Sequence, residues 1–271
     1  MSWLQERWGE ELIDRIKWNP TYKVIMDAGC GTGRVTKILA QKVGIKGTIY
    51  AVDVDPNMVN KAKVNLASFE KVFVIQSDIV NVSLPEKVNV IFSNAALHWI
   101  SDHRKLFSHF WDLLTNTLNT KKKSEGLLLA QCGGHGNLSK VRRILNQMIK
   151  LDDFESHFHD WQEPWYFAKP EDTEKLLSEI GFENIHVFLS DGTTRFAGRK
   201  SYSDFVSTVI MKPYLENLPK KQLKQKFLRS FLDRVEEMKL AWTLDYVRLN
   251  IMAGCIPPTS PFSLSATPSI R

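Results

Sequence analysis

The sequence has few cysteines, and they are not spaced as a disulfide framework or a zinc site requires. Its 271 residues include only Cys30, Cys132 and Cys255, an odd number without a Cys-x-x-Cys pair. Disulfide-stabilised scaffolds and structural zinc sites are therefore not expected. A reducing compartment is the simplest setting for such a chain, and we expect it to be cytoplasmic.

Long apolar runs are also missing. No stretch approaches the roughly 20 consecutive apolar residues of a membrane-spanning helix. The segment from Met1 to Gln5 lacks the charged and apolar regions of a signal peptide. The sequence thus predicts neither a membrane span nor a membrane partner.

Clustered charge is scarce, although the net charge is +6. Lysines and arginines are spread along the chain, and the one tight run is Lys121 to Lys123. A solvated loop accounts for that run more simply than a nucleic-acid patch does, so a nucleic-acid partner is not expected. A positive balance is compatible with small anionic substrates.

The first three-quarters of the chain alternates strand-like with helix-like patterns. Strands are predicted at 23–28, 48–55, 71–78, 88–94 and 126–134, and helices at 34–43, 56–66, 102–118 and 137–150. Alternation of this kind predicts an α/β fold: a doubly wound, mostly parallel sheet of the Rossmann type, covered by helices on both faces.

The pattern changes after Leu151. An aromatic connection leads to a helix at 171–180, a strand at 184–191, a helical stretch at 202–238 broken by Pro213 and Pro219, and a last strand at 242–253. We expect a single domain over 1–253, with a cofactor half (1–150) and an acceptor half (151–253) whose helical insertion before the last strand forms a lid. The Pro- and Ser-rich composition of 254–271 predicts disorder.

A glycine-rich turn follows the first predicted strand. It reads Asp27-Ala-Gly29-Cys-Gly31-Thr-Gly33. A dinucleotide fingerprint would place its third glycine at the position of Arg34, and no Gly-Lys-Ser/Thr follows as in a P-loop. An acid before the glycines favours a cationic ligand over a phosphate.

With this loop the chain resembles class I S-adenosylmethionine-dependent methyltransferases, which have a seven-stranded sheet. The resemblance implies S-adenosylmethionine as cofactor and further contacts at later strand ends: Asp53 to the ribose hydroxyls, Asp78 to the adenine amino group, and Asn94 at the active-site mouth. The full set of cofactor-binding residues that it implies is Asp27, Gly29, Gly31, Gly33, Asp53, Val54, Met58, Asp78, Ile79 and Asn94.

The nature of the methyl acceptor is indicated from the fourth strand onward. Ser93-Asn94-Ala95-Ala96 lacks the Asp/Asn-Pro-Pro-aromatic motif of amino methylases. Cys132, which a cytosine-C5 enzyme could use as a nucleophile, has no accompanying second cysteine and is expected to be a small buried residue.

The stretches "IFSNAALHWISDH" and "LLAQCGGHGNL" resemble the trans-aconitate methyltransferase family and related small-carboxylic-acid methyltransferases. "SYSDFVSTVIMKPYLENLP" and "DYVRLNI" add to the likeness, which spans about 4–253. The chain departs from that family in three places. The segment before Gly9, where the helix over the cofactor is expected, is shorter. A basic loop, "NTKKKSEG", replaces Pro-Gly-Gly, and the tail has no counterpart in the family. The short segment is expected to weaken cofactor binding.

The family resemblance implies methyl transfer to a carboxylate of a small acid. A carboxylate is already ionised at pH 7, so no general base is required. Positioning candidates are His98, Trp99 and Gln131, and candidates for holding the acid are His98, Trp99, Arg195, Arg199 and Arg248. Each also has a structural interpretation: a cap for His98, a pocket wall for Trp99, and solvated loop positions for Arg195 and Arg199.

Other functions stay open at this point. A carrier-protein or larger organic acid could be the acceptor, with basic residues at Lys121 to Lys123 and Lys220 to Lys226 as the docking surface. A non-catalytic S-adenosylmethionine-binding protein and an RNA methyltransferase are further alternatives. We expect a monomer acting on a small-molecule carboxylic acid.

Overall fold

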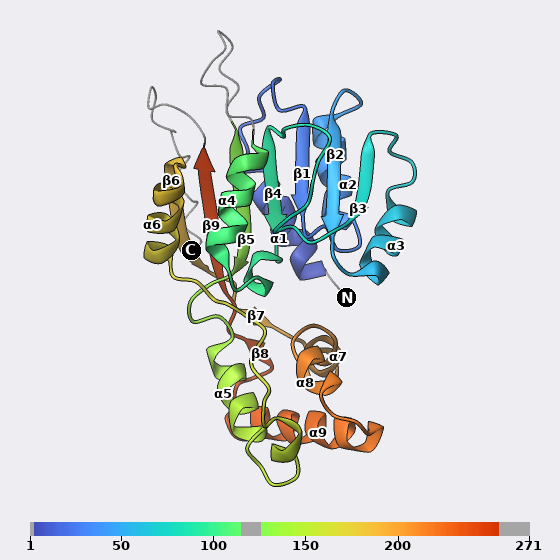
Figure 1. Cartoon of the computed structure of the whole chain (residues 1–271). Coiled ribbons are helices and arrows are strands. Elements are labelled where there is room, and N and C mark those ends of the chain that lie inside the picture. The colour runs from blue at the N-terminus through green and yellow to red at the C-terminus, as the bar shows by residue number, and fades with distance from the viewer. Residues whose placement is uncertain (1–2, 115–125, 255–271) are drawn as a thin grey trace. The chain divides into compact units, whose positions relative to one another are not determined.

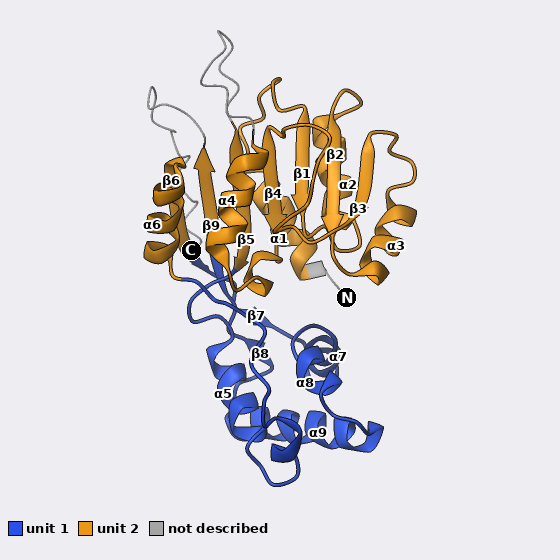
Figure 2. Cartoon of the chain, viewed as in Figure 1, with its two compact units in different colours: residues 1, 133–168, 189–249 blue, residues 2–132, 169–188, 250–271 orange. Residues whose placement is uncertain are grey.

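The computed structural model describes residues 3–114 and 126–254. They form two compact units (Figure 2). The sheet unit comprises the described residues of 2–132, 169–188 and 250–254, and the helical unit comprises 133–168 and 189–249. Both units contain segments of both halves expected from the sequence, so the assignment of one half to the cofactor and the other to the acceptor stays a prediction.

Seven strands form the main sheet in the order β3-β2-β1-β4-β5-β9-β6 (Figure 1). Their bounds are β1 Val24–Ala28, β2 Thr48–Asp53, β3 Val72–Gln76, β4 Val90–Asn94, β5 Leu127–Gly133, β6 Glu183–Asp191 and β9 Val247–Gly254. The pairs β1–β2, β1–β4, β2–β3 and β4–β5 are all parallel. The predicted doubly wound, mostly parallel sheet is therefore confirmed.

Local sequence explains the first elements. β1 is buried along nearly its whole length, as expected for a strand covered on both faces. α2 (Arg34–Val43) begins after Gly33, whose φ of 78° allows the sharp turn from loop to helix. α3 (Pro56–Asn65) begins with proline, and the Asp55 carboxylate caps it by accepting from Asn57 N at 2.8 Å.

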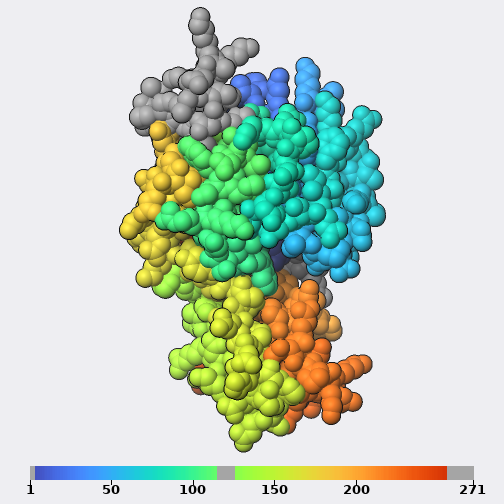
Figure 3. Space-filling model, in the orientation of Figure 1, coloured from blue at the N-terminus to red at the C-terminus, as the bar shows by residue number. Residues whose placement is uncertain are grey.

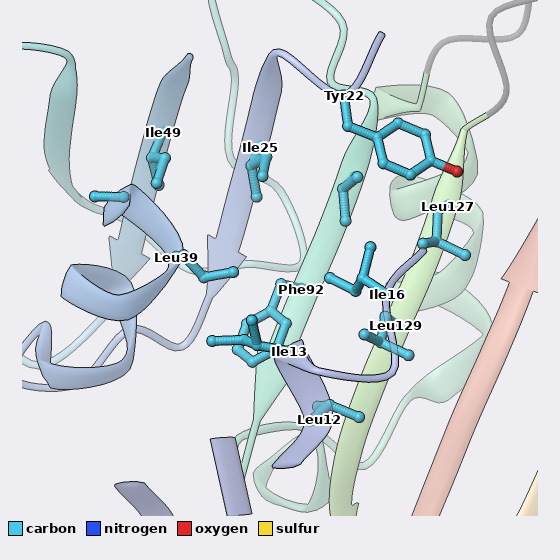
Figure 4. Close-up of a cluster of buried hydrophobic side chains, with 12 residues drawn as sticks. Leu12, Ile13, Ile16, Tyr22, Ile25, Leu39, Ile49, Phe92, Leu127 and Leu129 are labelled. Atoms are coloured by element: carbon cyan, nitrogen blue, oxygen red, sulfur yellow. The ribbon is translucent and has the colours of Figure 1, made fainter. Parts of the chain in front are cut away.

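The main core lies between the sheet and two helices, α1 (Trp3–Ile13) and α2 (Figure 4). Leu12 and Ile13 from α1 belong to the same buried cluster as Phe92 from β4 and Leu129 from β5. All four are no more than 1% exposed. The segment before Gly9 therefore forms a helix that is anchored in this core.

Two helices pack on each other in front of the sheet in Figure 1: α4 (His103–Leu113) and α6 (Pro170–Ile180). Arg104 of α4 pairs with Glu179 of α6 at 2.5 Å. α6 ends at Gly181, which adopts a left-handed conformation with φ 114° next to the ring of Trp111. The predicted end of this helix at residue 180 is confirmed.

The helical unit holds α5 (Ser139–Met148), α7 (Arg199–Val209), α8 (Lys212–Glu216), α9 (Lys221–Glu237) and a small antiparallel pair of strands, β7 (Thr194–Arg195) and β8 (Thr243–Leu244). Figure 3 shows the orange segment of this unit at the molecular surface. Tyr202, Phe205 and Tyr214 are at most 2% exposed. These aromatic residues are thus packing residues of the helical unit.

Two expectations need correction, and three others fall outside the described residues. The helical stretch is divided into α7, α8 and α9 as predicted, and Pro213 lies in the first turn of α8, which begins at Lys212. The last predicted strand, 242–253, is two strands, because β8 pairs with β7 while β9 joins the main sheet. α4 ends at Leu113, short of the predicted 118. Cys255, the Lys121 to Lys123 run and the predicted disorder of the tail lie outside the described residues.

Among the described residues, no helix has the length and apolar character needed to cross a membrane.

Candidate functional site

Polar side chains gather where parallel strands of the sheet end. The order β3-β2-β1-β4 places Asp78, Asp53, the glycine loop and Asn94 in succession along one edge. Ligands of open α/β sheets bind at the carboxyl ends of the strands. The residues that the sequence singled out one by one therefore share a single edge of the sheet unit.

The glycine loop exposes bare backbone at Gly31. Gly29, Gly31 and Gly33 all have positive φ, at 82°, 55° and 78°. A Cβ at Gly29 would lie 2.2 Å from the Cβ of Ala96, so this glycine is needed for close packing of the loop on the segment after β4. A Cβ at Gly31 would meet no described atom within 4 Å. Gly31 thus presents its backbone to open space, as a ligand lying over the loop requires.

Asp53 orders this loop from the end of β2. Its Oδ2 accepts a hydrogen bond from Gly31 N at 2.8 Å, and its Oδ1 accepts from Asp55 N at 2.9 Å. Each carboxylate oxygen has a second lone pair, and the side chain is only partly buried. Asp53 is therefore able to accept from two vicinal hydroxyls beside the open face of Gly31.

Asp27 lies beneath the loop, 2% exposed. Its Oδ2 accepts from Thr36 Oγ1 at 2.6 Å. Burial raises the pKa of this carboxyl to about 7, the Thr36 hydrogen bond opposes the shift, and the Asp53 charge adds to it. The structure thus gives Asp27 a protein partner, and its role toward a cationic ligand stays a prediction.

The adenine side of the predicted site lies beyond β2 and β3. Asp78 is exposed, and its Oδ1 accepts from Val80 N at 3.0 Å. Ile79 is buried, Met58 is half-buried, and Val54 is 64% exposed. An apolar side chain this exposed, next to Asp53, suits contact with a flat heterocycle.

Asn94 ends β4 and carries an unsatisfied acceptor. Its Nδ2 donates to the Gln5 carbonyl at 2.7 Å, whereas its Oδ1 is buried without a partner among the described residues. A buried acceptor left without a hydrogen bond costs about 1–3 kcal/mol. A bound group that carries N–H or O–H donors would relieve this cost. The bare Gly31 backbone, the free lone pairs of Asp53 and the Asn94 oxygen together fit a ligand that combines a nucleoside with an ammonium group.

His98 and Trp99 form a short 3-10 turn, η1 (Leu97–Trp99), directly after β4. Trp99 is 46% exposed, and its ring centroid lies 5.5 Å from that of His98. Burial and the nearby His103 lower the pKa of His98 to about 4. The imidazole is therefore neutral at pH 7 and can offer a donor to an anion but no charge.

Cys132 lies at the end of β5 and is 4% exposed. Burial raises the pKa of its thiol to about 12, and a hydrogen bond from the His98 backbone opposes the shift. A thiol in this state is not a nucleophile at neutral pH. The expectation of a small buried residue is confirmed.

Gln131 is 2% exposed and belongs to a buried polar network. Its Nε2 donates to Asn250 Oδ1 at 2.7 Å, and Arg15 Nη1 donates to the same oxygen at 2.8 Å. Arg15 and Asn250 were not singled out from the sequence, since residues 119 and 235 positions apart give no local signal. The positioning role of Gln131 stays a prediction.

The three arginine candidates, Arg195, Arg199 and Arg248, belong to the helical unit. Arg199 pairs with Asp233 at 2.6 Å and Glu236 at 2.5 Å, and its guanidinium lies 5.8 Å from the centroid of Trp242. It therefore ties α7 to α9. Whether Arg195 and Arg248 hold an acid stays a prediction.

Among the described residues no group of three or more His, Cys, Asp or Glu side chains is placed to hold a metal ion.

Comparison with known proteins identifies the ligand class. A family model described as a methyltransferase domain matches residues 25–117, the segment that holds the glycine loop, Asp53, Asp78 and Asn94. This segment is a methyltransferase domain, and the relatives described below support its assignment to the class I S-adenosylmethionine-dependent methyltransferases. The predicted family and the predicted cofactor are thereby confirmed.

Relatives of this methyltransferase match it over most of its length. It is 29% identical to the juvenile hormone acid O-methyltransferase of Bombyx mori, over 85% of this chain and 80% of that protein. It is 26% identical to the trans-aconitate 2-methyltransferase of Escherichia coli, over 84% of this chain and 82% of that protein. The predicted resemblance to the trans-aconitate enzymes thus exists at low identity.

A solved structure shows the same fold. The phosphoethanolamine N-methyltransferase 2 of Haemonchus contortus, solved with phosphomonomethylethanolamine and S-adenosylhomocysteine, matches with a TM-score of 0.57 and 18% identity. The match covers 93% of this methyltransferase and 53% of the other chain, so the methyltransferase spans about half the length of that protein.

Proposed function

We propose that this methyltransferase O-methylates a carboxylate of a small organic acid, with polycarboxylates such as trans-aconitate as the first candidates. Two relatives act, by their names, on juvenile hormone acid and on trans-aconitate. These acceptors differ in size and polarity but both carry a free carboxylate. The resemblance of the Asn94 to Trp99 stretch to small-acid methyltransferases agrees with this choice.

The observation that carries the proposal is the likeness to these two relatives over 84% or more of this chain, and the state of His98 agrees with it. With a pKa near 4, its imidazole is a poor base for taking a proton from a hydroxyl or an ammonium group. Cys132 is a buried, protonated thiol. An acceptor that is already anionic at pH 7 needs neither group, and a carboxylate with a pKa of about 4 is such an acceptor.

Catalysis then rests on position. When bound, S-adenosylmethionine supplies a methyl group that a carboxylate oxygen takes with its own electron pair, while the pair of the broken C–S bond stays on sulfur. Asp53 and the Gly31 backbone fix the nucleoside end, and Asn94 fixes the other end. His98 donates a neutral N–H toward the acid, and the half-exposed Trp99 walls its pocket and limits water.

A methyl-transfer screen tests the proposal. The full chain is incubated with methyl-labelled S-adenosylmethionine and, in parallel, trans-aconitate, other polycarboxylates, long-chain acids, malonyl-carrier protein and RNA. We expect label in a polycarboxylate, in a form released as methanol by alkali, as for an ester.

Label found in any other arm of the screen would contradict a different part of the proposal. Label in a long-chain acid or in the carrier protein would overturn the small-acid choice but keep carboxyl methylation. Alkali-stable label in RNA would overturn carboxyl methylation. Cofactor binding without label in any arm would indicate a non-catalytic protein.

A further inference from the structure

A second unsatisfied amide oxygen lies beside Asn94. Gln5 Oε1, on α1, is buried without a hydrogen-bond partner among the described residues, as is Asn94 Oδ1. The two residues touch, since Asn94 Nδ2 donates to the Gln5 carbonyl at 2.7 Å. Two such acceptors in contacting residues are unusual, because most buried polar atoms of native proteins are paired.

The seating of α1 explains why Gln5 faces this region. Gly9 lies one helical turn after Gln5 and hence on the same face of the helix. A Cβ at Gly9 would lie 3.1 Å from Asn94 Nδ2 and 2.7 Å from a methyl group of Val35 in α2. The glycine lets α1 approach the end of β4 this closely, and that approach brings the Gln5 amide to the site edge.

The order of the strands indicates which part of the cofactor would reach this point. Asp78 follows β3, Asp53 ends β2, the glycine loop follows β1, and Asn94 ends β4. With adenine assigned to the β3 side and ribose to Asp53, the methionine portion extends toward β4. Its ammonium group carries three N–H donors and no acceptor, which complements two amide oxygens that lack donors.

We propose that Gln5 is a cofactor-positioning residue: its amide oxygen and that of Asn94 jointly accept hydrogen bonds from the α-ammonium group of S-adenosylmethionine. The inference rests on the cofactor assigned above and not on the acceptor. It gives the short N-terminal helix a direct part in the cofactor site. The two oxygens would hold the methionine portion from opposite elements, α1 and β4, and so fix the direction of the reactive methyl group.

Two ligands that differ in the amino-acid portion distinguish a cofactor-positioning role of Gln5 from a structural one. S-adenosylhomocysteine carries the ammonium group, whereas 5′-methylthioadenosine keeps the nucleoside and sulfur but lacks the amino-acid portion. Calorimetric titrations of the full chain with both ligands would compare wild type, Gln5→Leu, Gln5→Glu and Gln41→Leu. Gln41 lies on the exposed face of α2 and serves as the matched control.

We expect Gln5→Leu to weaken S-adenosylhomocysteine binding about tenfold to a hundredfold, the usual effect of a hydrogen bond to a charged group. Binding of 5′-methylthioadenosine should stay within twofold. Gln5→Glu keeps the acceptor and adds a negative charge, so its affinity for S-adenosylhomocysteine should equal or exceed that of wild type. Gln41→Leu should change neither affinity.

Thermal unfolding without ligand supplies a second readout. Because Gln5→Leu removes an unsatisfied buried acceptor, its melting temperature should equal or exceed that of wild type. A lower melting temperature with equal loss of both ligands would show that Gln5 is structural and overturn the inference, as would unchanged S-adenosylhomocysteine binding. A wild-type chain that binds neither ligand would instead overturn the cofactor assignment itself.

Discussion

At the residue scale, Asp53 orders the glycine loop, and we predict that it also determines cofactor affinity. Its carboxylate holds Gly31 N and Asp55 N and keeps lone pairs for ribose. We predict that Asp53→Ala weakens S-adenosylhomocysteine binding at least a hundredfold, because it removes the ribose acceptor and the loop contact together. Calorimetric titration measures this, and an affinity within threefold of wild type would contradict it.

Asp55→Ala is the control for that variant. This substitution removes the side chain that caps α3 but keeps the backbone N–H of residue 55, which donates a hydrogen bond to Asp53. We predict a loss of about 1 kcal/mol of stability, typical of a lost N-cap, with cofactor affinity unchanged. Unfolding in urea and the same titration would check both halves. A large drop in affinity would mean that the Asp53 effect is not specific.

Asp27 predicts a pH dependence of cofactor binding. Its pKa of about 7 means that the buried carboxyl is largely protonated at pH 6 and ionised at pH 8. A cationic ligand favours the ionised form, so affinity should rise between pH 6 and pH 8, by at most about tenfold. Asp27→Asn should abolish this rise. Affinity that falls with pH, or an unchanged slope in the variant, would contradict the prediction.

The same group affects stability in the opposite direction. Its folded pKa lies above the value of 3.8 for an unfolded chain, so the folded state holds the proton more tightly. Its stabilising contribution is complete below about pH 4 and is lost as pH rises to about 7, a change of about 4 kcal/mol at most. Without ligand, Asp27→Asn should therefore be more stable than wild type at pH 8.

Single residues also show where sequence reasoning stops. Asp53, Asp78 and Asn94 could be predicted because each follows a recognisable strand. Asn250 could not, because its partners Arg15 and Gln131 are brought to it only by the sheet order. The unsatisfied oxygen of Gln5 likewise depends on how α1 is seated, which no local pattern encodes.

At the scale of elements, prediction succeeded where periodicity and caps coincide. α2 was predicted with its observed bounds and α3 within one residue of its end, since glycine, Asp55 and Pro56 mark their starts. The prediction of one continuous last strand was wrong. The alternation of apolar and polar residues continues through Asp245 and Tyr246, although β8 and β9 pair with different strands. Pairing partners are non-local and leave no signal in the strand itself.

An ion pair links α5 and α8 of the helical unit through the connecting segment that contains Glu163. Arg142 of α5 pairs with Glu163, whose Oε1 also accepts from Tyr214 of α8 at 3.0 Å. The Arg142 guanidinium lies 5.1 Å from the centroid of Phe167. We predict that Glu163→Leu alone costs about 3 kcal/mol, because it leaves a partly buried arginine without its anion.

The double variant Arg142→Met/Glu163→Leu is the matched test. It should recover part of the loss, since no charge remains unpaired. Unfolding in urea would measure the free energy of unfolding of the single and double variants. If the loss in the double variant equals the sum of the losses in Glu163→Leu and in Arg142→Met alone, the ion pair does not act as a unit.

At the scale of the whole molecule, the predicted site residues are divided between the two compact units. The predicted cofactor-binding residues belong to the sheet unit, and the three arginine candidates for holding the acid belong to the helical unit. Arg199 ties α7 to α9 through Asp233 and Glu236, whereas Arg248 lies on β9 of the main sheet and is the candidate that we choose for the test. We predict that Arg248→Met raises the KM for the acid at least tenfold without changing cofactor affinity.

Arg199→Met serves as its control. It should lower thermal stability, because it breaks two ion pairs, and leave the KM for the acid nearly unchanged. Steady-state kinetics on the acid found in the screen would compare the two variants. Equal effects of both substitutions on KM would contradict the assignment of Arg248.

The central claim is that a carboxylate oxygen of the acceptor takes the methyl group directly. It is tested most directly by the mass of the product formed from S-adenosylmethionine with a CD3 group and trans-aconitate with ¹⁸O in all its carboxylates. The account predicts a monoester that carries CD3 and retains every ¹⁸O atom. A product that has lost ¹⁸O, or the absence of any CD3-bearing acid, would contradict it.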